Sequence, residues 1–199
     1  MFGLINRAIQ RFVIDSYGET KWADVVSVAG LDFREFESML PYDDALTDAV
    51  LRAACLVLDK DHETLLEDLG TYLVTHPNME VVRRLLRYGG RGFEDFLLSF
   101  DELNNRIKLA IPDLEMPEIS LQEHGDGNYC LFAVSDREGY GAVLQGILKA
   151  VADDYGALIL TDLNSGTAQG RVTEHLKVEL LEAAFAEGRD FNLGGGMRM

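Results

Sequence analysis

The chain has 199 residues, of which 47% are apolar and 26% charged, a composition typical of a soluble globular protein with a real core. Its 34 acidic and 18 basic residues give a net charge of −16 at pH 7. This charge would repel the phosphates of nucleic acid and an anionic membrane surface, so we expect no nucleic-acid partner and no membrane partner. A basic surface on another protein would be attracted instead, although solubility alone also accounts for the charge.

The first predicted helix spans residues 2–17 and ends at Gly18. Four polar residues follow one side of this amphipathic stretch: Asn6, Arg7, Gln10 and Arg11. The stretch has no small-residue cleavage site, and no apolar run in the chain approaches the roughly 20 residues that span a bilayer. We therefore expect a cytoplasmic protein, in which Cys55 and Cys130 are buried free thiols rather than a disulfide.

Five further helices are predicted before Pro112, bounded by glycine, proline or a capping aspartate. They are expected at residues 20–29, 46–57, 62–74, 79–88 and 93–111.

Asn104 is an unusual residue on the last of these helices. It falls on an apolar stripe at helical spacing that consists of Phe96, Phe100, Leu103, Ile107 and Ile111. A carboxamide on an apolar face costs free energy unless it is hydrogen-bonded. Two interpretations stay open: an asparagine at the core edge that bonds to backbone, or a helix face that lines a cavity.

The second half of the chain has a different pattern. We predict strands at residues 118–124, 128–136, 157–163 and 171–181, and an amphipathic helix at 139–156. The fold class is therefore α+β: a helical N-terminal half packs on a C-terminal half with a roughly four-stranded antiparallel sheet and a flanking helix. The glycine-rich residues 186–199 are expected to form a flexible tail.

Ala133, Ser135 and Arg137 alternate along the second predicted strand, so we expect them to share one face. A hydroxyl beside a guanidinium suits a carboxylate ligand. The alternative is a strand end that carries an arginine into solvent.

Motifs of catalysis are missing from the sequence. It has no glycine-rich phosphate loop, no nucleophile elbow and no paired catalytic carboxylates, and its four histidines lack HxxxH or HxH spacing. We therefore predict neither an enzyme nor a metal site built from several histidines.

Several segments, in their order and spacing, resemble the heme nitric oxide/oxygen binding (H-NOX) family over residues 1–182. They are MFGLIN at 1–6, LLEDLG at 65–70, FDELN at 100–104, IPDLEMPE at 111–118, VSDREG at 134–139 and GILKAVADDYG at 146–156. The resemblance implies one H-NOX-like domain at 1–185, with a helical subdomain at 1–115 and a sheet-plus-helix subdomain at 116–185.

The resemblance also implies a heme between the two subdomains and a sensory role, in which bound nitric oxide or oxygen alters contact with a signalling partner. Bacterial partners in this family are typically histidine kinases or cyclic-di-GMP enzymes. Asn104 corresponds to the heme-ligating histidine of the family, and Pro117 to a proline that presses on the heme. Ala133, Ser135 and Arg137 correspond to the Tyr-x-Ser-x-Arg motif that holds the heme propionates.

Two of these positions depart from the family pattern. A neutral carboxamide is a poor iron ligand, so Asn104 predicts that no histidine–iron bond forms there. Ala133 lacks the tyrosine hydroxyl that would bind a heme propionate. In place of residue 104, the candidate iron ligands are His76, Tyr88 and Cys130. Two functions stay open: a sensor that binds heme or another tetrapyrrole, and a heme-free interaction module whose pocket is filled by side chains or an apolar ligand.

Overall fold

The structure is a computed structural model that describes residues 3–80, 82–83, 92–110, 116–168 and 170–188. Its helices are α1 (Gly3–Tyr17), α2 (Glu19–Ala29), α3 (Asp44–Leu58), α4 (His62–Thr75), the short 3-10 helix η1 (Pro77–Met79), α6 (Phe93–Leu98), α7 (Phe100–Ala110) and α8 (Tyr140–Tyr155). Its strands are β1 (Glu118–Gly125), β2 (Asn128–Ser135), β3 (Leu158–Ala168) and β4 (Arg171–Glu182).

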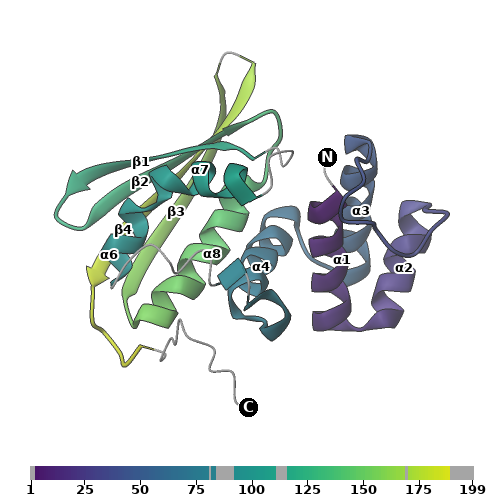
Figure 1. Cartoon of the computed structure of the whole chain (residues 1–199), viewed down its shortest axis with the longest axis horizontal. Coiled ribbons are helices and arrows are strands. Elements are labelled where there is room, and N and C mark those ends of the chain that lie inside the picture. Colours follow the sequence, from purple (N-terminus) through teal and green to yellow (C-terminus); the bar gives the residue numbers. More distant parts are fainter. Residues whose placement is uncertain (1–2, 81, 84–91, 111–115, 169, 189–199) are drawn as a thin grey trace.

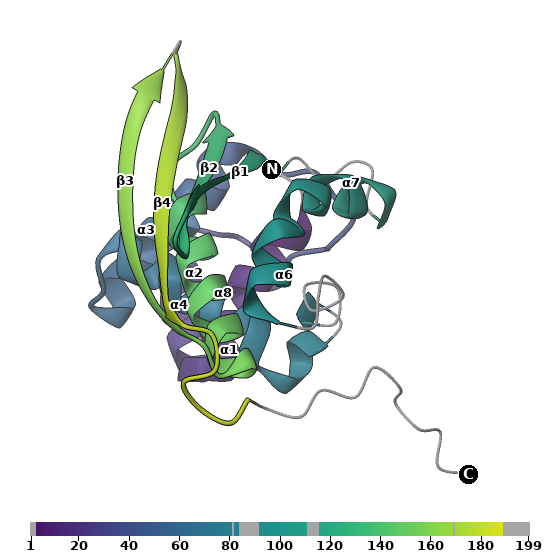
Figure 2. The ribbon, with the colours of Figure 1, turned by 90° about the vertical axis from the view of Figure 1, so that its left-hand side faces the viewer.

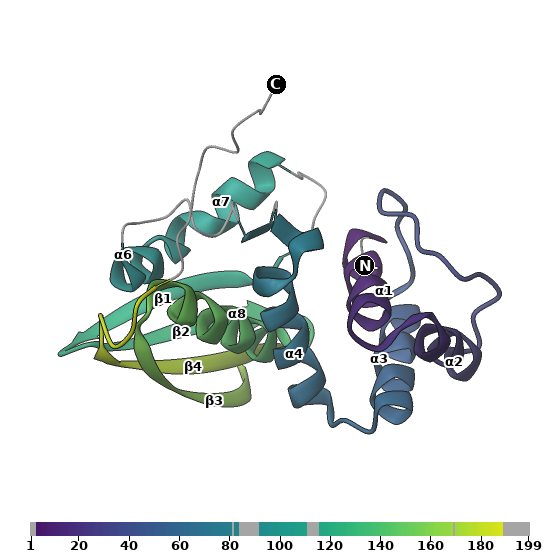
Figure 3. The same ribbon diagram turned by 90° about the horizontal axis from the view of Figure 1, so that it is seen from below.

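The four strands form one antiparallel sheet in the order β1-β2-β4-β3. Across the molecule, the sheet is followed by α8, then α4, and then a bundle of α1, α2 and α3 (Figure 1). Helix α8 packs on one face of the sheet, and no described helix covers the other face (Figure 2). Helix α7 lies along β1, on the same side of the sheet as α8 (Figure 3).

Two apolar clusters form the core, one on each side of the boundary between α4 and α8. The first lies between the sheet, α8 and α6, where Phe96, Leu148 and Leu176 are almost fully buried. The second lies among α1, α2, α3 and α4 and includes Val13 and Val50. The helical half and the sheet half thus each bury their own apolar side chains.

Helices α4 and α8 approach each other closely because glycines occupy their crossing. A Cβ at Gly70 would lie 2.1 Å from the carbonyl oxygen of Val143, and one at Gly146 would lie 1.9 Å from that of Glu67. Lys149 Nζ also donates a hydrogen bond of 2.7 Å to the Glu67 carboxylate. Only glycine leaves room for this crossing, since no methyl group fits at such distances.

The buried carboxylate of Glu174, on β4, attaches the start of α8 to the sheet. Its two oxygens accept hydrogen bonds from the backbone N–H groups of Gly139, at 2.9 Å, and Gly141, at 3.0 Å. The first N–H groups of a helix have no partner within the helix and carry a partial positive charge, so a carboxylate stabilises them. Gly139 itself has a φ of 107°, a conformation that favours glycine.

The predicted α+β fold with a four-stranded antiparallel sheet is confirmed. The single helix predicted at 93–111 is wrong in one respect: it is interrupted at Ser99, whose hydroxyl donates to the carbonyl oxygen of Phe96 at 2.7 Å. The third strand continues to Ala168 because β4 pairs with it along its whole length. Most of the helix predicted at 79–88 and of the tail predicted at 186–199 lies outside the described residues. Within the described residues, no helix has the length and apolar character needed to cross a membrane.

Candidate functional site

A cavity of about 790 Å³ lies where the two apolar clusters face each other. Its walls come from α1, α4, α7, α8 and the beginning of β1. The volume falls within the range of about 300–1,000 Å³ that is typical of small-molecule and cofactor sites. Apolar side chains dominate the lining: Leu4, Ile5, Ala8, Leu69, Leu73, Met79, Val82, Ile107, Met116, Pro117, Ile119, Val143, Leu144 and Ile147.

Helical spacing explains how single helices contribute several of these side chains. On α8, Tyr140, Val143, Leu144 and Ile147 stand three or four residues apart and therefore lie on one face of the helix. The polar part of the lining is small and consists of Arg7, Arg11, Ser38, Asn78 and Tyr140.

Of the predicted site residues, Pro117 lines the cavity. Asn104 lies within α7, but its side chain is outside the described part of the chain. Ile107, three residues further along α7, lines the cavity, so this helix forms part of the wall.

The other three predicted residues do not line the cavity. Ala133 and Ser135 are both buried on the sheet face that α8 covers, where Ala133 belongs to the first apolar cluster. Strand β2 ends at Ser135, so the alternation stops before Arg137. The Arg137 guanidinium instead forms an ion pair with Asp48 and lies 3.8 Å from a carboxylate oxygen of Asp44, both on α3. It is thus neither in bulk solvent nor in the cavity.

Two of the alternative iron ligands, His76 and Cys130, are not part of the cavity lining. The His76 ring stacks on Tyr72 with ring centroids 4.8 Å apart, and its Nδ1 accepts a hydrogen bond of 3.3 Å from the Asn78 N–H. Cys130 lies on the opposite side of the sheet from α8, and Tyr88 is outside the described residues. Among the described residues, no group of three or more His, Cys, Asp or Glu side chains is placed to hold a metal ion.

A polar network borders the cavity at Asn78. The Tyr72 hydroxyl donates to Asp15 Oδ2 at 2.6 Å, and Asn78 Nδ2 donates to the same oxygen at 2.9 Å. Burial and the bond to Asp15 raise the pKa of Tyr72. Burial alone would raise the pKa of Asp15 as well, but the hydrogen bonds from Tyr72 and Asn78 and the nearby His76 and Arg11 outweigh it and lower that pKa.

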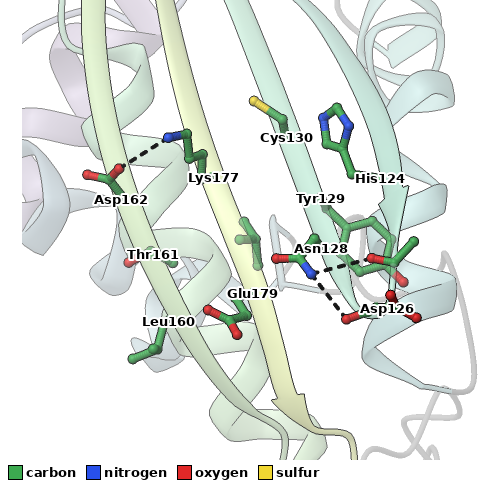
Figure 4. Close-up of a pocket in the computed structure, with 12 residues that line it drawn as sticks. His124, Asp126, Asn128, Tyr129, Cys130, Leu160, Thr161, Asp162, Lys177 and Glu179 are labelled. Atoms are coloured by element: carbon green, nitrogen blue, oxygen red, sulfur yellow. Dashed lines mark hydrogen bonds and ion pairs between the residues drawn. The ribbon is translucent and has the colours of Figure 1, made fainter.

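A second hollow, of about 710 Å³, lies on the uncovered face of the sheet (Figure 4). Its lining is more polar, with Lys177 Nζ 3.8 Å from a carboxylate oxygen of Asp162. Cys130 is a free thiol in its wall, as is the half-buried Cys55 elsewhere, and burial raises the pKa of both thiols, which makes them less reactive. No sequence pattern indicates this hollow, because alternating polar residues are typical of any solvent-facing strand.

The cavity between the clusters has the size and apolar walls for a large apolar ligand, but the described residues of its lining offer no histidine to ligate the iron of a heme. Its volume and apolar walls suit a molecule of tetrapyrrole size. Its described lining contains no histidine or cysteine, and α7, to which the sequence resemblance assigns the axial ligand, carries Asn104 at that position. The residues present therefore do not provide the histidine–iron bond that the sequence resemblance associates with this site.

A model of the family described as haem-NO-binding matches residues 2–160. Soluble guanylate cyclase gcy-32 of Caenorhabditis elegans is 28% identical over 176 residues, which cover 86% of this chain and 26% of the relative. The soluble guanylate cyclase beta-2 subunit of Rattus norvegicus is 27% identical over 131 residues, which cover 64% of this chain and 19% of the relative. The chain thus spans about a quarter or less of the length of these relatives.

Solved structures with the same fold include an oxygen-binding H-NOX domain related to soluble guanylate cyclases. It has a TM-score of 0.69 and 15% identity, over 96% of this chain and all of that chain. A structure from work on the mechanism of H-NOX activation has a TM-score of 0.76 and 15% identity, over 94% of this chain and all of that chain.

Proposed function

Because the chain belongs to the haem-NO-binding (H-NOX) family, whose members bind heme and act as sensor domains, we propose that it is a sensory ligand-binding domain. Its ligand is an apolar molecule of tetrapyrrole size, held without a histidine–iron bond. The observation that carries the proposal is the cavity of about 790 Å³ between the two apolar clusters.

The position of the cavity suggests how binding produces a signal. The lining includes Leu4 and Ala8 from α1, in the helical bundle, and Leu144 and Ile147 from α8, on the sheet. A ligand that touches both halves stabilises the arrangement in which both contacts are made, and so shifts the population of that arrangement. The contact with a signalling partner would depend on this population. The family implies a histidine kinase or cyclic-di-GMP enzyme as the partner, and the relatives suggest a cyclase.

The predicted binding roles differ in how much rearrangement they need. Pro117 would contact the ligand directly from its place in the wall. Ser135 and Arg137 would hold a ligand carboxylate only after Arg137 leaves Asp48 and Asp44 on α3. Both carboxylates are about half exposed, so water would solvate them, and losing this ion pair costs about 1 kcal/mol or less.

The test is an absorption titration of the purified protein with hemin and with metal-free protoporphyrin IX. We expect wild type to bind protoporphyrin IX, and we expect Asn104→His to change the heme Soret band to that of a histidine complex. Asn105→His is the matched control, because Asn105 is the next residue on α7 and is exposed. The Asn105→His protein should give the same heme spectrum as wild type.

Two results would contradict the proposal. Failure of wild type to bind either tetrapyrrole would favour the heme-free interaction module. A wild-type heme spectrum identical to that of Asn104→His would mean that another side chain ligates the iron.

A further inference from the structure

We propose that Arg7 and Arg11 of α1 bind the carboxylate of the cavity ligand, so that the ligand class is an apolar carboxylic acid. The inference rests on the proposed function, because it assigns one end of the same cavity. It differs from the role predicted for Ser135 and Arg137, which do not line the cavity.

The charge of the cavity lining is opposite to that of the whole chain. The chain carries 34 acidic and 18 basic residues, with a net charge of −16. Even so, the charged side chains among the described lining residues are two arginines, Arg7 and Arg11, without any Asp or Glu. An otherwise apolar site with a positive end and no described carboxylate of its own is suited to an anion attached to an apolar body.

Arg7 is fixed in place but keeps most of its hydrogen-bonding capacity. It is half-buried, and its Nη1 donates a hydrogen bond of 2.9 Å to the carbonyl oxygen of Phe36. A guanidinium has five N–H donors, so one such bond leaves others for a ligand. The Phe36 contact also reduces the side-chain freedom that would be lost on binding.

Arg11 is one helical turn further along α1, on the same face as Arg7. It is exposed, and it makes no hydrogen bond or ion pair with the described residues. Its charge acts on the carboxylate of Asp15, one turn further along, which accepts hydrogen bonds from Tyr72 at 2.6 Å and from Asn78 at 2.9 Å. Arg11 therefore stands at the mouth of the cavity with its N–H donors available to a ligand.

The two arginines define how the ligand lies. Its apolar body would pack between α7, α8 and β1, and its carboxylate would lie toward α1, where the guanidinium groups can bind it through paired N–H donors. By contrast, the positive charge of Arg137 is already compensated by Asp48 and Asp44. An incoming carboxylate therefore meets less competition at Arg7 and Arg11.

The experiment compares each acid with its ester by fluorescence titration of the full chain. One pair of probes is protoporphyrin IX and its dimethyl ester, and the other is cis-parinaric acid and its methyl ester. The variants are Arg7→Gln, Arg11→Gln and the double variant, with Arg52→Gln, exposed on α3, as the control whose charge change equals that of each single variant. Circular dichroism confirms that each variant is folded.

We expect the double variant to bind the acids about tenfold more weakly or worse, and to bind the esters as wild type does. Arg11→Lys should retain part of the affinity, because it keeps the charge and loses the paired donors. The protoporphyrin pair matches the proposed ligand size, and the parinaric acid pair shows whether the same arginines also bind a smaller apolar acid.

Two results would overturn the inference while leaving the proposed function intact. They are equal affinity of wild type for an acid and its ester, and an equal loss of acid affinity in Arg52→Gln and in the two single variants. If neither acids nor esters bind wild type, the proposed function fails as well.

Discussion

The crossing of α4 and α8 predicts a large effect from a single added methyl group, Gly146→Ala. The new Cβ would lie 1.9 Å from the Glu67 carbonyl oxygen, whereas ordinary contact needs about 3.5 Å. The two helices would have to separate by about 1.5 Å. Overpacking of this kind costs about 3 kcal/mol, and alanine regains about 1 kcal/mol through its higher helix propensity. The expected net loss of unfolding free energy is therefore about 2 kcal/mol.

Urea unfolding followed by circular dichroism measures this loss, and thermal unfolding should show a Tm lower by about 4–8 °C. Gly166→Ala on β3 is the matched control, because a Cβ there would meet nothing within 4 Å. If the unfolding free energy of Gly146→Ala lies within about 0.5 kcal/mol of that of Gly166→Ala, the close crossing of α4 and α8 is refuted.

Two further predictions concern carboxylates that accept hydrogen bonds within the fold. Glu174→Gln should lower the unfolding free energy in urea denaturation by about 1.5–3 kcal/mol, because one oxygen that accepts a backbone N–H becomes an amide donor. Unchanged stability would contradict the role of Glu174 at the start of α8. Asp15 has a pKa below its ordinary value of 3.8, so its ionised form stabilises the fold above that value, and this stability is lost as the pH falls through the lowered pKa. Stability measured from pH 6 to 2 should therefore fall more steeply below pH 3.8 in wild type than in Asp15→Asn, and parallel curves would refute this assignment.

Most of the fold could be predicted because its elements carry local signals. The apolar periodicity of α8 and the turn at residues 125–127 are encoded within a few residues of sequence. The interruption of the 93–111 helix could not be predicted, because the apolar spacing continues through Ser99. The interruption occurs where the Ser99 hydroxyl donates a hydrogen bond to the Phe96 carbonyl, which apolar spacing does not show. The length of β3 is likewise determined by pairing with β4 rather than by its own residues.

The candidate site was harder to predict because its contacts join distant parts of the chain. The partner of Arg137, Asp48, is 89 residues away in sequence, so no local pattern shows that this arginine turns toward α3. In the sequence, the polar side of the first helix indicates only an amphipathic surface. In the structure Gln10 on that side is buried and accepts a hydrogen bond of 3.0 Å from the Phe36 N–H, while Arg7 and Arg11 line the cavity.

The central claim, that the ligand binds between the helical bundle and the sheet half, is tested most directly by filling that space. Ala8→Phe places a ring in the cavity from α1, and Ala23→Phe adds the same ring at an exposed position on α2. Fluorescence titration with protoporphyrin IX should show binding at least about tenfold weaker in Ala8→Phe, with Ala23→Phe equal to wild type. Equal affinity in all three proteins would place the ligand elsewhere and contradict the account.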